Sequence, residues 1–539
     1  MMNKKVKQRI SVAIASVCAL SCLSVVGCGT TTKVNDPNVL DIVMPDLGYG
    51  TDWMEALAAD FTAKTGKKVE VDITPTEAGY STSILAGTAE YDIYLIREAP
   101  AKLLTTNAAN YSGYDPVLAS LDDVYNSKVR GEDVLFKDKM KDIYEQYNHV
   151  DHKATGDYHY YSVQWCDTVF SLVRNLEVWK NEWVIPNTTD ELLVLAEQIK
   201  NTDGGYTPFI WSAQATYWWQ VANLWVTQYQ GLEDMCGEKG FWNGYDEEGN
   251  QNVPEMWNRN GIYYALKVLD DLMNPENEYQ HTLSDSVDFT TAQGYFCTPE
   301  SKIAMMANGD WLYKEMVKNY SNAKLEMIQM PVVSGLIYHP DCENSIENDA
   351  ELSALIKAID ASDKDAGLTG AGYSVTQKAF DKVYEARKMY TCASQLNHIM
   401  ISPAYSKSLD IVKEFYLYLA SDEALKLYAR SSGGFTLGFD TSDEVYAEAY
   451  KTANSFVKSS LDIKQRNQVA PWPIISSRLF IAGGMPVFPT IEMNDQKEPE
   501  KIFMLKPDDG RLTADEMFVN NYRNAKQKWS MFMQAAGLQ

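Results

Sequence analysis

The chain of 539 residues is longer than most single domains, and its content of 45% hydrophobic and 22% charged residues is that of a folded protein. It carries 48 basic against 73 acidic residues, a net charge of −25. A surface this negative repels phosphate backbones and anionic lipid headgroups, which argues against nucleic acid as a partner. The 33 Tyr and 13 Trp suit neutral, hydroxylated ligands with apolar faces.

The first 28 residues have the order of a secretory signal that ends in a lipobox. A basic segment at 1–9 precedes an apolar stretch at 10–27, a little short for a membrane-spanning helix. The box reads Val25-Val26-Gly27-Cys28, and the Cys28 thiol would take a diacylglycerol. The alternatives are an ordinary signal peptide with an incidental cysteine and an earlier lipobox at Cys22. We therefore expect an extracytoplasmic protein that is held to the cell membrane only by the lipid on Cys28, through a polar tether at 28–37.

The remaining chain alternates strands with helices. Strands are expected at 39–44, 69–73, 91–96, 207–211 and, as a long strand pair, at 160–175. Helices are expected at 52–65, 80–86, 190–199, 217–229, 408–419, 421–429 and 514–535. Such alternation predicts mostly parallel sheets and two α/β lobes.

The sequence contains no complete motif of a catalytic or nucleotide-binding site. It lacks a GxSxG elbow, an HExxH pair, a P-loop and a full GxGxxG, so we expect neither an enzyme nor a cofactor. His149, His152 and His159 share one polar hairpin, and we interpret them as exposed loop residues rather than metal ligands. The cysteines after Cys28 are odd in number, widely spaced and without a CxxC pair, so we expect buried free thiols (Cys166, Cys236, Cys297, Cys342, Cys392).

Tryptophans concentrate in one region, with nine of the thirteen between Trp165 and Trp257. Within it, the segment 216–219 follows a predicted strand and opens a helix, where open α/β sheets bind ligands. Pyranose rings offer CH-rich faces that stack on indole and phenol rings, and their hydroxyls take hydrogen bonds from charged and amide groups. One of Trp218 and Trp219 is expected to pack inward while the other faces the ligand.

The order of these segments resembles extracellular solute-binding protein family 1, the maltose-binding-protein-like receptors of ABC sugar importers. Segment 39–69, which ends in Thr65-Gly66-Lys67-Lys68-Val69, is similar to the family's opening, and 304–311, an Ala-Met strand running into Gly-x-Trp, resembles its most recognisable segment. The paired helices at 406–429 and the segments at 485–489 and 510–516 are also similar. The likeness covers most of 39–535.

The chain also departs from the family pattern. Insertions are apparent near 230–255, 340–392 and 490–508, and Arg174 stands where such proteins usually carry Tyr. Val163-Gln164-Trp165 replaces the usual proline of the first crossover. These departures are compatible with the family's fold, but because of them the ligand cannot be inferred from the resemblance.

The resemblance implies a two-lobed clamshell of the periplasmic-binding-protein kind, with discontinuous lobes joined by hinge crossovers. Lobe 1 is expected at 38–165 and 328–435, and lobe 2 at 166–327 and 436–539. A monomer of this kind binds a sugar or oligosaccharide between its lobes and delivers it to the permease of an ABC importer.

The resemblance also places the ligand-binding residues. Asp46 and Tyr49 follow the first strand, Arg97 and Glu98 follow the third, Trp165 and Asp167 lie on the first crossover, and the platforms of lobe 2 are Tyr217, Trp218 and Trp311. Two plainer interpretations stay open: Arg97 and Glu98 pair with each other, and Trp165 belongs to the core.

Two other functions stay open on the sequence. An oligopeptide receptor has a similar length and anchor, but the segment Gly309-Asp310-Trp311 and the early strand–helix order favour the sugar receptor. A glycan-degrading enzyme would need a pair of carboxylates brought together by folding.

Overall fold

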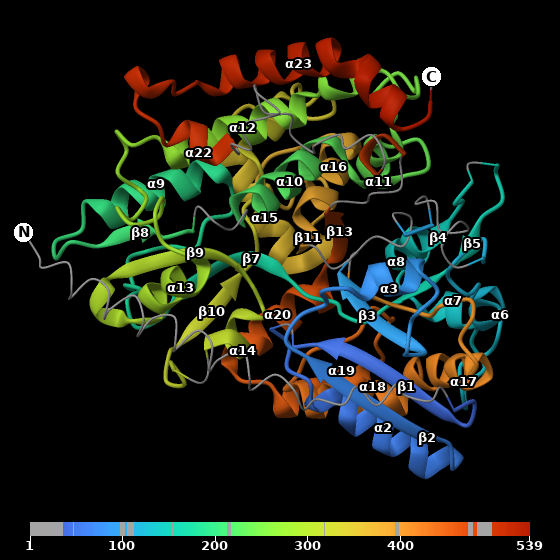
Figure 1. The fold of residues 1–539 in the computed structure, drawn as a ribbon. Coiled ribbons are helices and arrows are strands. Elements are labelled where there is room, and N and C mark those ends of the chain that lie inside the picture. Colours follow the sequence, from blue (N-terminus) through green and yellow to red (C-terminus); the bar gives the residue numbers. More distant parts are fainter. Residues whose placement is uncertain are drawn as a thin grey trace, which may run out of the picture.

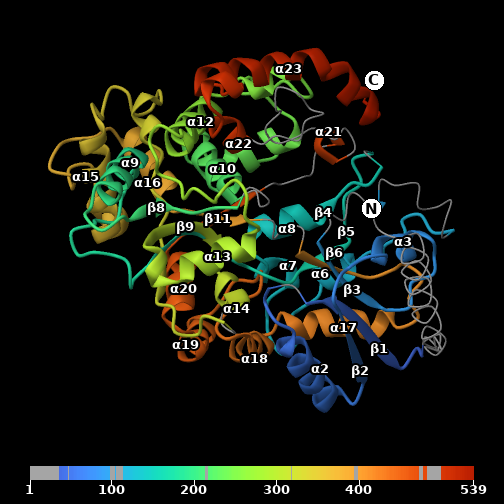
Figure 2. The ribbon, with the colours of Figure 1, turned by 60° about the vertical axis from the view of Figure 1, so that its left-hand side comes forward.

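Two separate sheets organise the chain into two α/β lobes (Figures 1 and 2). A third, two-stranded sheet is the β4–β5 hairpin (His149–Val150 and His159–Tyr160). The computed structural model describes residues 36–46, 48–97, 103–104, 113–153, 155–212, 217–316, 319–393, 398–472, 478–481 and 499–538.

The sheet of lobe 1 has five strands in the order β2-β1-β3-β12-β6. Strand β1 pairs in parallel with β2 and β3, whereas β12 is antiparallel to both of its neighbours. All residues of β1 after the first are buried, as expected for a strand covered on both faces. The strands are β1 (Val39–Pro45), β2 (Lys68–Thr74), β3 (Ile93–Arg97), β6 (Ser162–Gln164) and β12 (His398–Ile401).

Helix α2 (Asp52–Thr65) shows why the N-terminal segment folds as the sequence predicts. Its acidic first turn complements the helix dipole, and Trp53, Leu57 and Phe61 form one buried face. Gly66, at φ 74°, ends the helix in the left-handed region and donates its N–H to the carbonyl of Thr62. The other helices of lobe 1 are α3 (Tyr80–Leu85), α6 (Asp122–Tyr125), α7 (Phe136–Lys139), α8 (Asp142–Asn148), α17 (Leu409–Leu419) and α18 (Asp422–Ser432).

The sheet of lobe 2 is centred on β7 (Phe170–Asn175). Strands β9 (Ile303–Gly309), β10 (Leu325–Ile328) and β11 (Met389–Ala393) all pair with β7 in antiparallel fashion. The sheet is completed in parallel by β8 (Thr207–Phe209) beside β9 and β13 (Gln468–Trp472) beside β11. Both sheets are therefore mixed rather than mostly parallel, which corrects the prediction from the βα alternation.

Helices cover the sheet of lobe 2, and the longest of them, α23 (Ala514–Ala535), lies across α12 at the top of Figure 1. Thr513 and Glu516 form a capping box that starts α23 at the predicted residue. The remaining helices of this lobe are α9 (Thr189–Lys200), α10 (Tyr217–Gln230), α11 (Leu232–Cys236), α12 (Asn260–Met273), α13 (Phe289–Cys297), α14 (Leu312–Met316), α15 (Asp349–Ser362), α16 (Gln377–Arg387), α20 (Ser455–Arg466), α21 (Arg478–Ile481) and α22 (Pro499–Phe503). Helix α19 (Asp443–Thr452) lies between α18 and α20 and packs mainly on α18 of lobe 1.

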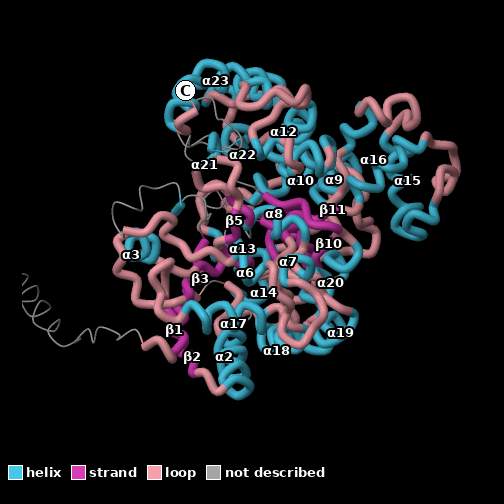
Figure 3. The backbone as a smooth tube through the Cα atoms, turned by 90° about the vertical axis from the view of Figure 1, so that its right-hand side faces the viewer, coloured by secondary structure: helices cyan, strands magenta, loops and turns pink. Residues whose placement is uncertain are grey.

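Residues 328–393 belong to lobe 2, whereas the sequence analysis placed 328–435 in lobe 1. Strand β11 pairs with β7 and β13, and α16 packs on α10, on the side of lobe 2 that Figure 3 shows. The predicted strand pair at 160–175 is also wrong, because β6 and β7 lie in different sheets. Both errors arise because strand pairing between distant segments leaves no local signal in the sequence.

The described elements change from one lobe to the other at three places along the chain. The first crossover is 165–169, between β6 and β7, and the third lies within 433–454, between α18 and α20. These two crossovers touch each other through a bridge between Asp167 and Thr436. The second connects β11 to β12 through residues outside the described part of the chain.

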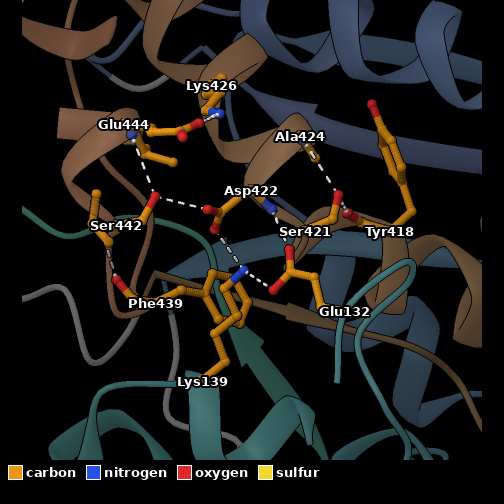
Figure 4. A network of polar contacts seen from close by, with 12 residues as sticks. Glu132, Lys139, Tyr418, Ser421, Asp422, Ala424, Lys426, Phe439, Ser442 and Glu444 are labelled. Atoms are coloured by element: carbon orange, nitrogen blue, oxygen red, sulfur yellow. Dashed lines mark hydrogen bonds and ion pairs between the residues drawn. The ribbon is translucent and has the colours of Figure 1, made fainter. Parts of the chain in front are cut away.

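A polar network around the buried Lys139 anchors the start of the third crossover to lobe 1 (Figure 4). Lys139 donates from Nζ to Glu132 (2.5 Å) and Asp422 (2.7 Å), while the Asp422 N–H donates to the other oxygen of Glu132 (2.6 Å). The Ser442 hydroxyl, at the N-cap of α19, donates to Asp422 (2.7 Å). The starts of α18 and α19 are thereby fixed to the segment 132–139.

Candidate functional site

Aromatic side chains from both lobes meet beside the crossovers. Tyr49, in the loop after β1, makes edge contacts with Trp165 (ring centroids 5.7 Å apart), Phe435 (5.8 Å) and His398 (6.1 Å). It also contacts Trp311 of lobe 2, with centroids 6.2 Å apart. Tyr49 and Trp165 are buried, whereas Trp311 is half-buried. We call these five residues, together with Phe170 and Tyr217 described next, the aromatic cluster.

Lobe 2 completes this cluster from two elements. Phe170, at the start of β7, contacts both Tyr217 (5.5 Å between centroids) and Trp311 (5.8 Å). Burial and the nearby Glu315 carboxylate raise the pKa of Tyr217 above its ordinary value, so the hydroxyl stays neutral and can still donate a hydrogen bond.

A carboxylate and an amide lie beside the half-buried rings. Glu315 is one helical turn after Trp311, and Gln293 of α13 donates from Nε2 to its Oε2 (2.7 Å). Burial raises the pKa of Glu315. The other carboxylate oxygen, Oε1, approaches lobe 1, because a Cβ built on Gly48 would lie 3.4 Å from it. Gly48 has φ of 47°, so a side chain there would be both strained and close to Glu315.

Among the side chains of the aromatic cluster, Glu315 and Gln293, two buried polar atoms have no hydrogen-bond partner in the described part of the chain. They are the indole N–H of Trp165 and the side-chain oxygen of Gln293. Leaving a buried donor or acceptor unpaired costs about 1–3 kcal/mol. The site therefore combines half-buried rings that can stack on a ligand with a donor and an acceptor that are buried and unpaired among the described residues.

The structure brings together four of the residues predicted for the site: Tyr49, Trp165, Tyr217 and Trp311. Trp165 is nevertheless almost wholly buried and stacks on Trp53 (5.8 Å, 19° between planes), so it forms the base of the cluster. Trp218 is not part of it. Its side chain is fully buried and packs edge-on against Phe209, which corrects the prediction of an exposed platform.

Asp167 points away from the rings into a buried ionic cluster. It accepts from Lys141 (2.7 Å) and from the hydroxyls of Tyr144 (2.8 Å) and Tyr390 (3.1 Å). Burial disfavours its charge, but Lys141 and Lys464 outweigh that cost and lower the pKa of the Asp167 carboxyl. These contacts assign Asp167 to the hinge rather than to a ligand surface.

The remaining predicted residues lie elsewhere. Asp46 is exposed, and its backbone N–H donates to the Thr74 carbonyl. Arg97 is also exposed and forms an ion pair with Glu77 (3.1 Å), at the edge of a 170 Å³ cavity. The pairing of Arg97 with Glu98 stays untested, because Glu98, like Cys28, lies outside the described residues.

Sequence reasoning missed Glu315, Gln293, His398 and Phe435. The four-residue spacing of Trp311 and Glu315 is a helical signal that could have identified the carboxylate. The other three reach the cluster only through the packing of distant segments. For the described residues, no group of three His, Cys, Asp or Glu side chains could hold a metal ion. Nor does that part of the chain contain a helix that is long and apolar enough to span a membrane.

Comparisons with known proteins bear on the fold. No protein-family model and no curated protein matches the chain. Among solved structures, the SBP RafE in complex with raffinose has 14% sequence identity and a TM-score of 0.51, over 90% of this chain and 99% of that one. The binding protein MsmE from Bacillus subtilis, in an open conformation, has 14% identity and a TM-score of 0.53, over 91% of this chain and 97% of that one.

These similarities extend over nearly the whole described chain and both lobes. They show that the protein shares the two-lobed, mixed α/β fold of these two binding proteins. In this fold the aromatic cluster lies where the two lobes face each other, because Tyr49 and Trp311 come from different lobes.

Proposed function

We propose that this protein is the lipid-anchored substrate-binding protein of an ABC importer, related to solute-binding protein family 1, and that it binds a sugar or oligosaccharide. The observation that carries the proposal is the aromatic cluster between the lobes, with Glu315 and Gln293 beside its half-buried rings. The raffinose complex of a protein with the same fold supports a carbohydrate ligand.

The chemistry of the site suits a pyranose ring. Trp311 and Tyr217 supply flat faces for its CH groups, while Glu315 and the unpaired Gln293 oxygen accept from its hydroxyls. A ligand that touches Tyr49 and Trp311 together contacts both lobes and stabilises the closed arrangement. A micromolar dissociation constant corresponds to about −8 kcal/mol.

Calorimetric titration with raffinose and a panel of other neutral oligosaccharides tests this function. At least one sugar should bind saturably and reduce the radius of gyration measured by solution scattering. The same titrations with tri- to pentapeptides test the oligopeptide receptor, and analysis of the sugars afterwards for new reducing ends tests for an enzyme. Binding of peptides but of no sugar, or turnover of a sugar, would replace the proposed function.

The anchoring and delivery parts of the proposal rest on the sequence. Cys28→Ala should leave the precursor unprocessed or release the protein from the membrane fraction, with a mass that lacks the lipid. Unchanged fractionation and unchanged mass in the variant would contradict the lipid anchor. The closed, sugar-bound protein is the form that we expect the permease to recognise.

A further inference from the structure

One buried lysine touches three segments that meet at the hinge. Lys464 of α20 is 3% exposed, and its ammonium donates to the backbone carbonyl of Asp167 in the first crossover. It also donates to the Thr436 hydroxyl in the third crossover (3.1 Å). Its third neighbour is the Asp310 carboxylate, at 3.6 Å. A single side chain therefore links two crossovers to the end of β9.

Asp310 holds the end of β9 against the first crossover. Its backbone N–H donates to the Val169 carbonyl (3.0 Å), and its Oδ2 accepts from the Val169 N–H (3.2 Å). The next residue is Trp311, the half-buried ring of the aromatic cluster. Any displacement of Asp310 relative to the crossover is therefore transmitted directly to Trp311.

The charged groups around Lys464 also contact lobe 1, through the side chain of Asp167. The Asp167 side chain accepts from Lys141 and Tyr144, which precede the first crossover, and from Tyr390 of β11 in lobe 2. Two carboxylates thus alternate with two ammonium groups: Lys141, Asp167, Lys464 and Asp310. Burying such charges gives little or no net stability compared with well-packed apolar residues, but it fixes geometry because each pair has preferred directions.

We propose that Lys464 is the positioning residue of the hinge: it sets the angle between the lobes and the placement of Trp311 relative to the crossovers. Closure of two-lobed proteins is a rotation about the few residues that connect the lobes, and Lys464 binds two of those connections at once. The part that concerns Trp311 rests on the proposed sugar-binding function, whereas the part that concerns the lobe angle does not.

The test compares Lys464→Met with Lys458→Met. Methionine keeps most of the length of the side chain and removes its charge, and Lys458 is an exposed lysine on the same helix. Spin labels at Lys68→Cys of β2 and Val519→Cys of α23, both on exposed side chains in different lobes, report the inter-lobe distance by pulsed electron resonance without ligand. The parent without these two cysteines measures labelling of native thiols.

We expect a broadened and shifted distance distribution in Lys464→Met and the parent distribution in Lys458→Met. Affinity for raffinose, or for the best sugar of the panel, should fall about tenfold in Lys464→Met. A folded Lys464→Met protein with a lower melting temperature but the parent distance distribution would overturn the proposal, because the lysine would then only stabilise the fold.

Should Lys464→Met fail to fold, the isosteric Asp310→Asn removes one charge partner of Lys464 and is judged by the same distance measurement. An unchanged distribution in that variant would also contradict the proposal. If the parent protein bound no sugar but the distribution of inter-lobe distances still broadened in the variants, the proposed function would be refuted. The role of Lys464 in the hinge would then still be supported.

Discussion

The aromatic cluster and the buried ionic cluster share two stretches of chain, 165–167 and 310–311, yet their side chains differ in charge and in the partners that they contact. Asp310 is fully buried among charges, and Trp311, the next residue, is half-buried among rings. On the first crossover, Trp165 likewise lies among rings and Asp167 among charges, but both of these side chains are buried. Charged groups with several directed partners fix a geometry, whereas partly exposed rings and unsatisfied acceptors are available to a ligand. Proximity in sequence therefore says little about which role a residue has.

Among the variants that test this contrast, Asp167→Ala is expected to lose the most stability. The substitution removes the buried carboxylate that accepts from Lys141 and also attracts the nearby Lys464, and breaking a buried pair in this way costs about 3–5 kcal/mol of stability. A urea melt measures it. Asp46→Ala, an exposed aspartate once assigned to the same site, is the control and should melt like the parent. A melt of Asp167→Ala that matches the parent would refute the structural role.

Trp218→Ala tests the correction to the predicted site. Because the ring is fully buried against Phe209, its removal should cost about 3–5 kcal/mol of unfolding free energy. The folded fraction should bind sugar with parental affinity. Reduced affinity with unchanged stability would return Trp218 to the ligand surface.

Trp311→Ala should behave in the opposite way. Its half-buried ring is expected to be a stacking platform, so binding should weaken by about 1–3 kcal/mol, the range of a well-packed aromatic anchor. Stability should stay near that of the parent. Calorimetric titration and a denaturant melt on the same protein separate the two quantities, and a large loss of stability with intact affinity would identify Trp311 as a core residue.

Glu315→Gln should have a smaller effect on binding. The amide keeps the shape of the side chain but weakens a charge-assisted hydrogen bond to a ligand hydroxyl, a change of about 1 kcal/mol. Titration of the same sugar measures it. The exposed Glu300→Gln in the same lobe is a matched control. Tighter binding by Glu315→Gln would show that the carboxylate opposes the ligand.

The smallest expected effect is a change in the melting temperature with pH. Burial raises the pKa of the Asp310 carboxyl from 3.8 to about 6, despite the nearby Lys464. A raised folded-state pKa contributes stability that is present at low pH and is lost as the pH rises through about 6. The melting temperature of Asp310→Asn, relative to the parent, should therefore be higher at pH 7.5 than at pH 5. Trp311→Ala should follow the parent across this range, and a parallel profile for Asp310→Asn would contradict the assigned pKa.

The sequence predicted those elements that carry their own signals. Helix α2 begins and ends at the predicted residues because its acidic first turn, its buried face and Gly66 lie within it or next to it. The capping box at Thr513 likewise fixes the start of α23. Strands β11 and β12 could not be placed in this way, because their partners lie between 79 residues (Met389 and Gln468) and 301 residues (His398 and Arg97) away.

For the site, the sequence likewise predicted the positions that carry a local signal. Trp311 follows a recognisable strand, and Tyr217 opens a predicted helix, so their positions beside the strand ends could be expected. Burial could not. Whether Asp167 faces Lys141 or a ligand, and whether Trp218 packs on Phe209, depends on side chains that other segments bring into contact.

The position of β12 has a consequence for the order of folding. It pairs with β3 on one side and with β6 on the other, so β6 cannot join the rest of the sheet of lobe 1 until residue 401 has been synthesised. Lobe 2 contains all the chain from β7 to β11 by then and lacks only its edge strand β13 and the helices that follow β12. Distant strand pairing is slow, and unpaired strand edges attract other chains. We therefore expect the core of the N-terminal lobe to stay incomplete until β12 has been synthesised, and its exposed β3 edge to be a part of the nascent chain that needs protection from aggregation.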